Sequence, residues 1–160
     1  MTKYVIDSCS LNELDYKYPN HIPVFEPIYT KLNQMFEDGE LFSVREVFEE
    51  LKNSQDYWED YEECFRELTE DESEKVTELL GDPKFSVFVS HGMNNNDGCW
   101  ADPHLIACAM EDPEVVIVSQ ESLRREPQRK IPYVCEQKDI RCIKLLEFLD
   151  EINIMWKFVV

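Results

Sequence analysis

Val115-Val116-Ile117-Val118, followed by Ser119-Gln120-Glu121, is the stretch of sequence that decides the fold class. Its first four residues are β-branched and apolar without alternation. That pattern is typical of a strand in a parallel sheet whose two faces are both covered. The polar residues that follow mark the end of the strand. Residues 115–121 therefore predict a sheet with helices on both of its faces.

A second strand of this kind lies at the start of the chain. Lys3-Tyr4-Val5-Ile6 is short and mainly apolar, and it ends on Asp7. Strand patterns alternate with helical patterns along the rest of the chain, which is typical of α/β proteins. The sequence therefore predicts one domain over residues 1–160, of class α/β, with three α/β/α layers around a central, mainly parallel sheet.

The segments between and after these strands predict helices and two further strands. One helix runs from Pro27 to a C-cap at Gly39. Ser43 has the position of an N-cap for a helix over residues 44–51, with Glu46 completing a capping box. Residues 85–89 are ambiguous between strand and helix. The other predicted segments are a loop at 90–98, a helix from Asp102, a basic loop at 124–130, a short strand near Ile140, a helix through 145–152 and a terminal strand at 155–160.

Charge and composition exclude several classes of protein. The chain has 34 acidic and 16 basic residues, for a net charge of −18. So acidic a surface repels nucleic acid and anionic lipid at long range, which excludes a protein that coats DNA without specificity. No apolar run approaches the ~18–20 residues of a membrane helix, and no basic-then-apolar leader opens the chain. The six cysteines are scattered, which favours buried free thiols in a reducing compartment. We expect a cytoplasmic protein with no membrane contact.

Residues 56–78 form a strongly acidic segment in which Arg66 and Lys75 are the only bases. Apolar and aromatic residues still recur at helical spacing within it, so the segment predicts two solvated helices packed along one stripe. The same acidic surface could dock a basic partner protein, and that alternative stays open. The residues of the stripe are Tyr57, Tyr61, Cys64, Phe65 and Leu68.

Four acidic residues stand at positions that could form a site: Asp7, Glu50, Asp102 and Glu121. Asp7 and Glu121 follow buried strands, and the carboxyl ends of parallel strands form the edge where ligands bind. Carboxylates brought together raise each other's pKa unless a cation neutralises them, and Mg²⁺ or Mn²⁺ prefers such oxygen ligands. Each acid also has a purely structural interpretation. Asp7 could belong to a strand-end turn and Glu50 to a solvated helix surface. Asp102 could be an N-cap and Glu121 a loop residue.

Four segments, taken in order, resemble the motifs of PIN-domain ribonucleases: residues 5–11, 43–51, 101–109 and 116–121. Ala-Asp-Pro-His-Leu-Ile-Ala at 101–107 and Lys-Ile-Pro-Tyr-Val-Cys at 130–135 look like the DUF4411 family within that group. The resemblance implies a PIN-like fold and a metal-dependent endoribonuclease of the kind found in toxin–antitoxin pairs. In such enzymes water attacks the phosphodiester in line and leaves a 5′-phosphate and a 3′-hydroxyl.

The resemblance also implies a role for each matching residue. Asp7 and Asp102 would bind the Mg²⁺ or Mn²⁺ ion directly. Glu50 and Glu121 would complete the metal site or position a water molecule. Ser10 resembles the hydroxyl residue that supports the metal or a phosphate in these sites.

The sequence departs from the family pattern at two positions. Cys9 stands where PIN domains often have Asn or Ser, and Glu121 stands where many have Asp. Glu46 lies one helical turn before Glu50 and is a rival for the second acidic position.

A cluster of bases after Glu121 suggests where RNA would bind. A positive patch beside carboxylates is what a phosphate backbone needs on an otherwise acidic protein, although a solubilising loop would have the same composition. The resemblance implies RNA as the substrate, with an antitoxin protein and a second copy of the chain as candidate partners. The residues of the cluster that we expect to contact RNA are Arg124, Arg125, Arg129 and Lys130.

Two other functions remain to be weighed against a nuclease. The first is a non-catalytic PIN-like module that docks a protein through the acidic segment at 56–78. The second is a phosphatase of the haloacid-dehalogenase kind, which also begins with an Asp at a strand end. That class needs another Asp two residues later, and Cys9 occupies the position.

Overall fold

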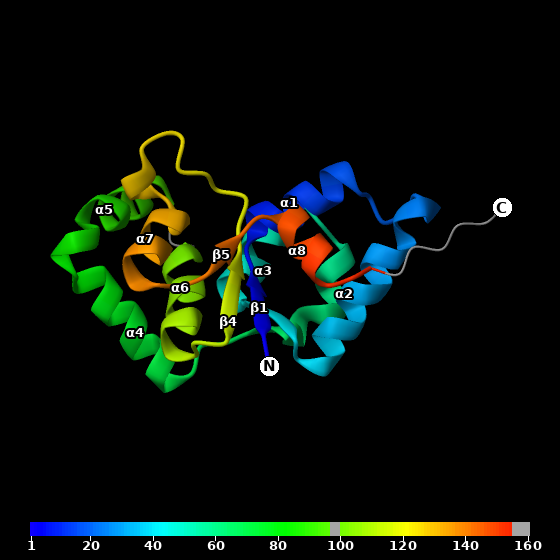
Figure 1. Ribbon diagram of the computed structural model, residues 1–160, viewed down its shortest axis with the longest axis horizontal. Helices are drawn as coiled ribbons and strands as arrows, with labels where there is room; N and C mark the ends of the chain where they lie inside the picture. The colour runs from blue at the N-terminus through cyan, green and yellow to red at the C-terminus, as the bar shows by residue number, and fades with distance from the viewer. Residues whose placement is uncertain (97–99, 155–160) are drawn as a thin grey trace.

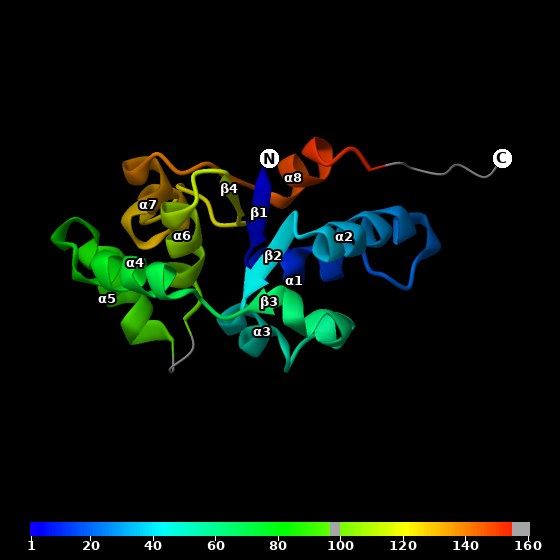
Figure 2. The ribbon, with the colours of Figure 1, turned by 90° about the horizontal axis from the view of Figure 1, so that it is seen from below.

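The computed structural model describes residues 1–96 and 100–154. Within these residues the centre is a five-stranded sheet in the order β3-β2-β1-β4-β5, and every pair of neighbouring strands is parallel (Figures 1 and 2). The sheet confirms the predicted fold class. The strands are β1 (Lys3–Ile6), β2 (Leu41–Val44), β3 (Phe65–Arg66), β4 (Val115–Val118) and β5 (Cys142–Ile143).

Helices form a layer on each face of this sheet (Figures 1 and 2). One layer contains α1 (Ser8–Lys17), α2 (Glu26–Asp38) and α8 (Leu145–Glu151). The other contains α4 (Glu70–Gly81), α5 (Ser86–Asn95), α6 (Asp102–Glu111) and α7 (Ile131–Lys138). Helix α3 (Arg45–Leu51) directly follows β2. Short 3₁₀ helices occupy Pro23–Phe25, Tyr57–Cys64, Pro83–Phe85 and Pro127–Arg129. The arrangement confirms the expected three layers.

The two central strands explain why the sheet needs both layers. Val5, Ile6, Ile117 and Val118 are completely buried, because successive side chains of a strand point to opposite faces and both faces are covered. In the pairing of β1 with β4, Ile6 lies opposite Val118. The residues that follow these two strands therefore start from the same edge of the sheet.

Several helices lie where the sequence predicts them. Helix α2 ends at Asp38, and Gly39 follows with a φ of +76°, the left-handed conformation that favours glycine at a C-cap. The N–H group of Gly39 donates to the last carbonyls of the helix, so the predicted cap is confirmed. Helices α6 and α8 match the predictions from Asp102 and through 145–152.

The predicted capping box at Ser43 is wrong. Ser43 lies inside β2, and the helix begins two residues later with Val44 at its N-cap position. The Ser43 Oγ is fully buried and donates to the Ile6 carbonyl at 2.6 Å. The Ser-x-x-Glu pattern is a local signal, and here the pairing of Leu41–Val44 with β1 overrides it.

The acidic segment also differs from its prediction of two packed helices. Residues Tyr57–Cys64 form a 3₁₀ helix, and Phe65 enters β3, where it pairs with Ser43. Helix α4 starts after Thr69, which forms a complete capping box with Glu72. The buried side chain of the 3₁₀ helix is Trp58, with Tyr57 and Tyr61 packed around it.

Other segments were predicted incompletely. Residues 86–95 are helix α5, which resolves the ambiguity at 85–89 and replaces most of the loop predicted at 90–98. Helices α1 and α7 have no counterpart among the predicted elements. Of the five cysteines in the described ranges, Cys108 and Cys135 are buried free thiols, whereas Cys9 is exposed. The strand predicted at 155–160 lies outside the described residues.

In the part of the chain that the structure describes, every helix is too short or too polar to cross a membrane.

Candidate functional site

Asp7 lies at the carboxyl edge of the sheet, between β1 and α1. It is the N-cap of α1, and its Oδ1 accepts the backbone N–H of Ser10 at 2.7 Å. Ser10 is completely buried, and its Oγ donates to the Val118 carbonyl at 3.2 Å. Ser10 therefore fixes the start of α1 to the end of β4 and holds Asp7 in place.

Burial determines the protonation of Asp7. The residue is only 4% exposed, and burial raises the pKa of its carboxyl group from 3.8 to about 6. Hydrogen bonds from the side chains of Ser10 and Ser119 oppose this change, and the negative charge of Glu121 adds to it. At neutral pH most of this carboxyl group is ionised, so a nearby cation would stabilise its buried negative charge.

Glu50 connects three elements of the site. Its Oε2 accepts the hydroxyl of Ser8, at the start of α1, at 2.5 Å. Its Oε1 accepts the backbone N–H of Ala101, just before α6, at 3.2 Å. Glu50 itself projects from α3. These two bonds bring α3 to the edge of the sheet where Asp7 lies.

Asp102 is the first residue of α6, and the N-cap position belongs to Ala101. The simple N-cap interpretation of Asp102 is therefore wrong. Burial raises the pKa of Asp102 well above its usual value, and the charges of Glu121, Asp7 and Glu50 raise it further. A hydrogen bond with the Trp100 side chain acts in the opposite direction.

Glu121 follows β4 and is fixed at both its backbone and its side chain. Its N–H donates to the Ser119 Oγ at 3.3 Å, and its Oε2 accepts the N–H of Ile131, the first residue of α7, at 2.7 Å. Burial raises the pKa of Glu121, whereas the bond from Ile131 and electrostatic interactions with Lys130 and His91 lower it.

Cys9 shows that the four acids surround one region. Although the residue is exposed, loss of hydration around its thiol raises its pKa to about 12. The charges of all four acids contribute to the increase, in the order Asp7, Glu121, Asp102 and Glu50. The structure thus brings together the four acids singled out in the sequence, from four different elements.

Glu46 lies toward a different neighbour. Its Oε2 is 3.5 Å from the Nδ1 of His104 on α6. The charge of Glu50 raises the pKa of Asp102, and the hydrogen bonds of Glu50 go to Ser8 and Ala101, the neighbours of Asp7 and Asp102. Glu50 therefore belongs to the acidic cluster, and Glu46 contacts the same helix, α6, at His104.

The donor atoms of the cluster suit a hard divalent cation, which prefers carboxylate oxygens and keeps several of its waters. Both carboxylate oxygens of Glu50, and one each of Asp7 and Glu121, already accept hydrogen bonds from the protein. Among the described side chains, no three His, Cys, Asp or Glu residues are grouped closely enough to hold an ion by themselves. An ion in this region would therefore need water as part of its ligand shell.

Three residues that hold the acids in place are not among those predicted from the sequence. Ser8 holds Glu50, Ser119 holds Asp7, and Trp100 interacts with Asp102. Two of these could have been found, because Ser8 and Ser119 are polar residues directly after predicted strands. Nothing in the spacing of Trp100 indicated its contact.

Trp100 also packs against α5 at Gly92. Gly92 is buried, and a Cβ atom at this position would overlap the Trp100 indole ring. The same ring contacts Phe88, with 5.1 Å between the ring centroids. Helix α5 therefore positions the residue that precedes the Ala101–Asp102 turn.

We expect Gly92→Ala to destabilise the protein by about 1–3 kcal/mol, because the added methyl group must displace a packed indole. The measurement is chemical denaturation followed by Trp fluorescence. Gly81→Ala is the matched control, because a Cβ at Gly81 meets no atom within 4 Å. Equal stability of the two variants would contradict the role given to the contact between Gly92 and Trp100.

The predicted basic cluster lies between β4 and α7. Arg124 and Arg125 are exposed, whereas Arg129 and Lys130 are partly buried. Arg129 Nη1 donates to Glu126 Oε2 at 2.5 Å. Lys130 occupies the N-cap position of α7, and its charge acts on Glu121. Lys130 is therefore a member of the basic cluster whose charge reaches the acids.

Sheet, layers and cluster together define an α/β protein with a carboxylate site at the carboxyl edge of its parallel strands. The chain belongs to the DUF4411 family, a domain of unknown function, whose model matches residues 4–156. No curated protein matches the chain. The resemblance to DUF4411 in the sequence is confirmed, and the relation to PIN domains stays a prediction.

Proposed function

We propose that this protein is a Mg²⁺- or Mn²⁺-dependent endoribonuclease of the PIN toxin type. The observation that carries the proposal is the convergence of four carboxylates from four elements on one edge of the sheet. Folding places like charges together there, and it raises the pKa of three of them. Such an arrangement is costly unless it binds a cation, so it supports a site selected for metal binding.

Asp7 and Asp102 would hold the cation directly, and Glu50 and Glu121 would hold it through water. The hydrogen bonds support the indirect role of Glu50, because both of its oxygens already accept protein N–H or O–H groups. The roles of Asp7, Asp102 and Glu121 in this division follow the resemblance to PIN domains. A hard divalent ion bound there supplies positive charge for the phosphate and lowers the pKa of water.

The protein's own residues supply rigid positioning. Ser10 and Ser119 hold Asp7, and the Ala101 N–H holds Glu50. Asp7 directly follows β1, Glu50 and Asp102 lie on helices, and Glu121 is held by Ile131 at the start of α7, so the geometry of the carboxylates depends on the packed core. A carboxylate held in this way can accept a proton from a water molecule without rearranging.

RNA would reach the acids along the basic cluster of Arg124, Arg125, Arg129 and Lys130. The remaining surface carries a large negative charge, so a phosphate backbone is attracted at this place and repelled elsewhere. RNA as substrate is consistent with a cytoplasmic location. From the resemblance to PIN-domain toxins we also propose an antitoxin protein and a second copy of the chain as partners.

The proposal is tested by incubating the purified protein with a mixed RNA pool and Mn²⁺ and analysing the ends of the products. We expect fragments with 5′-phosphates and 3′-hydroxyls, formed only when the divalent ion is present. A parallel reaction with a chelator serves as the control.

Fragments with 2′,3′-cyclic phosphates, formed equally in the chelator, would contradict the proposal. They would indicate a contaminating metal-independent ribonuclease. Absence of any cleavage would instead favour the non-catalytic module that docks a basic protein through residues 56–78.

A further inference from the structure

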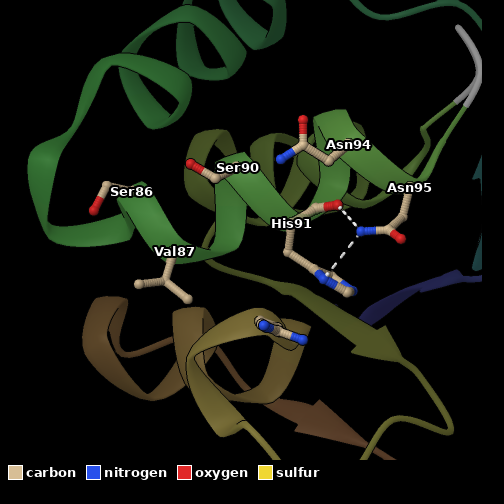
Figure 3. Close-up of a pocket in the computed structure, with 7 residues that line it drawn as sticks. Ser86, Val87, Ser90, His91, Asn94 and Asn95 are labelled. Atoms are coloured by element: carbon tan, nitrogen blue, oxygen red, sulfur yellow. Dashed lines mark hydrogen bonds between the residues drawn. The ribbon is translucent and has the colours of Figure 1, made fainter.

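A polar cavity of about 400 Å³ lies between α5 and the 3₁₀ turn Pro127–Arg129 (Figure 3). Helix α5 supplies two hydroxyls, two amides and one imidazole to its wall. Arg129 contributes from the opposite side, and Val87, which is 51% exposed, provides an apolar surface. The polar residues of α5 in this wall are Ser86, Ser90, His91, Asn94 and Asn95.

The α5 side of the cavity is formed by one face of that helix. Ser86, Ser90 and Asn94 are four residues apart, as are Val87, His91 and Asn95, so the two rows lie side by side along α5. Asn95 Nδ2 donates to the His91 carbonyl at 2.7 Å and lies 3.2 Å from the imidazole Nδ1 (Figure 3). Asn95 thereby limits the orientation of the His91 ring.

The cavity adjoins the acidic cluster. His91, which lines the cavity, interacts electrostatically with Glu121. Arg129 precedes by two residues the Ile131 N–H that donates to Glu121. One residue from each side of the cavity is thus connected to Glu121, His91 by its charge interaction and Arg129 through the start of α7.

The chemistry of the wall matches a nucleotide. Amide and hydroxyl groups both donate and accept hydrogen bonds, as the edges of nucleobases require. The guanidinium of Arg129 is suited to a phosphate. The apolar side chain of Val87 can contact the face of a base. Proteins that recognise single-stranded RNA bind its unpaired bases in this way.

We propose that this cavity binds one nucleotide of the RNA, next to the phosphate that is cleaved. The base contacts Val87, Ser90 and Asn94, and the phosphate of the same nucleotide binds Arg129. This inference rests on the proposed ribonuclease function, to which it adds a site that selects and positions the substrate.

The test uses the four 5′-mononucleotides as probes, titrated into the protein in a chelator and followed by NMR of the backbone amides. We expect saturable shifts in α5 and the 127–129 turn, with weaker binding of inorganic phosphate and of the free nucleosides. Arg129→Gln should weaken nucleotide binding about tenfold, the usual cost of a lost charged hydrogen bond. Asn94→Ala should change the order of preference among the four bases.

Arg141→Gln is the matched control. Arg141 also pairs with a glutamate, Glu151, but it precedes β5 and so lies at the opposite edge of the sheet from the acids. We expect its variant to bind nucleotides as tightly as the wild type. In RNA cleavage, Arg129→Gln should raise KM about tenfold with little change in kcat, because the lost contact binds ground state and transition state alike.

Equal affinity of wild type and Arg129→Gln, or nucleotides that bind no better than phosphate, would overturn the nucleotide site without affecting cleavage by the acids. Tight nucleotide binding that depends on Arg129, in a protein that cleaves no RNA, would support the cavity as a nucleotide site and overturn the nuclease. The two failures are therefore distinguishable, since the binding measurement requires no metal and no turnover.

Discussion

Asp7→Asn is expected to lower the rate of Mn²⁺-dependent RNA cleavage by about a thousandfold or more, because it removes a neutralising ligand from the proposed metal site. Asparagine is as good an N-cap as aspartate, so the hydrogen bond from the Ser10 N–H and the start of α1 should survive. The measurement is the initial rate on a labelled RNA at saturating Mn²⁺. Asp15→Asn, at an exposed aspartate of the same helix, is the control.

Equal rates for Asp7→Asn and the wild type would show that the cleavage comes from a contaminant. A similar loss in Asp15→Asn would show that the rate responds to net charge or to the integrity of α1, and not to the carboxylate at the sheet edge.

The same substitution should stabilise the metal-free protein at neutral and higher pH. The pKa of Asp7 is about 6 in the folded protein, and 3.8 is its ordinary value, which applies in the unfolded chain. Between pH 3.8 and about 6 the folded state therefore binds more protons than the unfolded state. Stability therefore falls as the pH rises from about 4 to about 6, and the loss is complete above that window. The raised pKa corresponds to a loss of about 3 kcal/mol at most in the free energy of unfolding. Asp7→Asn removes it.

This expectation is checked by urea unfolding in a chelator from pH 4 to pH 8. The difference in unfolding free energy between Asp7→Asn and the wild type should grow across the window and then level off. At pH 8, Mn²⁺ should raise the melting temperature of the wild type and change that of Asp7→Asn much less, because an ion that binds only the folded state stabilises it by mass action. A difference that is flat with pH would contradict the buried charge at Asp7.

The positions of the acids could be predicted because each adjoins a strongly patterned element. Asp7 and Glu121 follow the two strands that are predicted at 3–6 and 115–118, and the parallel pairing of those strands brings their ends together. Asp102 and Glu50 could be assigned to the site only from the resemblance to known motifs, since acids are common at helix starts and on helix surfaces. The choice of Glu50 over Glu46 depended on contacts with Ser8 and Ala101 that no spacing reveals.

The errors came from segments where tertiary contacts outweigh local signals. Ser43 has the local pattern of a helix cap, yet its backbone belongs to β2 because Leu41 and Phe42 pair with β1. The Asn-rich end of α5 has the composition of a turn. It remains helical up to Asn95, where the packing of Trp100 on Gly92 and the bond from Asn95 to the His91 carbonyl support it.

The pairing of β1 with β4 has a consequence for synthesis on the ribosome. Lys3 pairs with Val115, so β1 is made more than a hundred residues before β4, which is one of its two neighbours in the sheet. Such long-range pairing folds late, because loop closure must precede the contacts that reward it. A nascent chain stalled before residue 102 holds Asp7 and Glu50 without Asp102 or Glu121. The carboxylate cluster is therefore completed only once residue 121 has been made, and products that end before residue 102 carry two of its four acids.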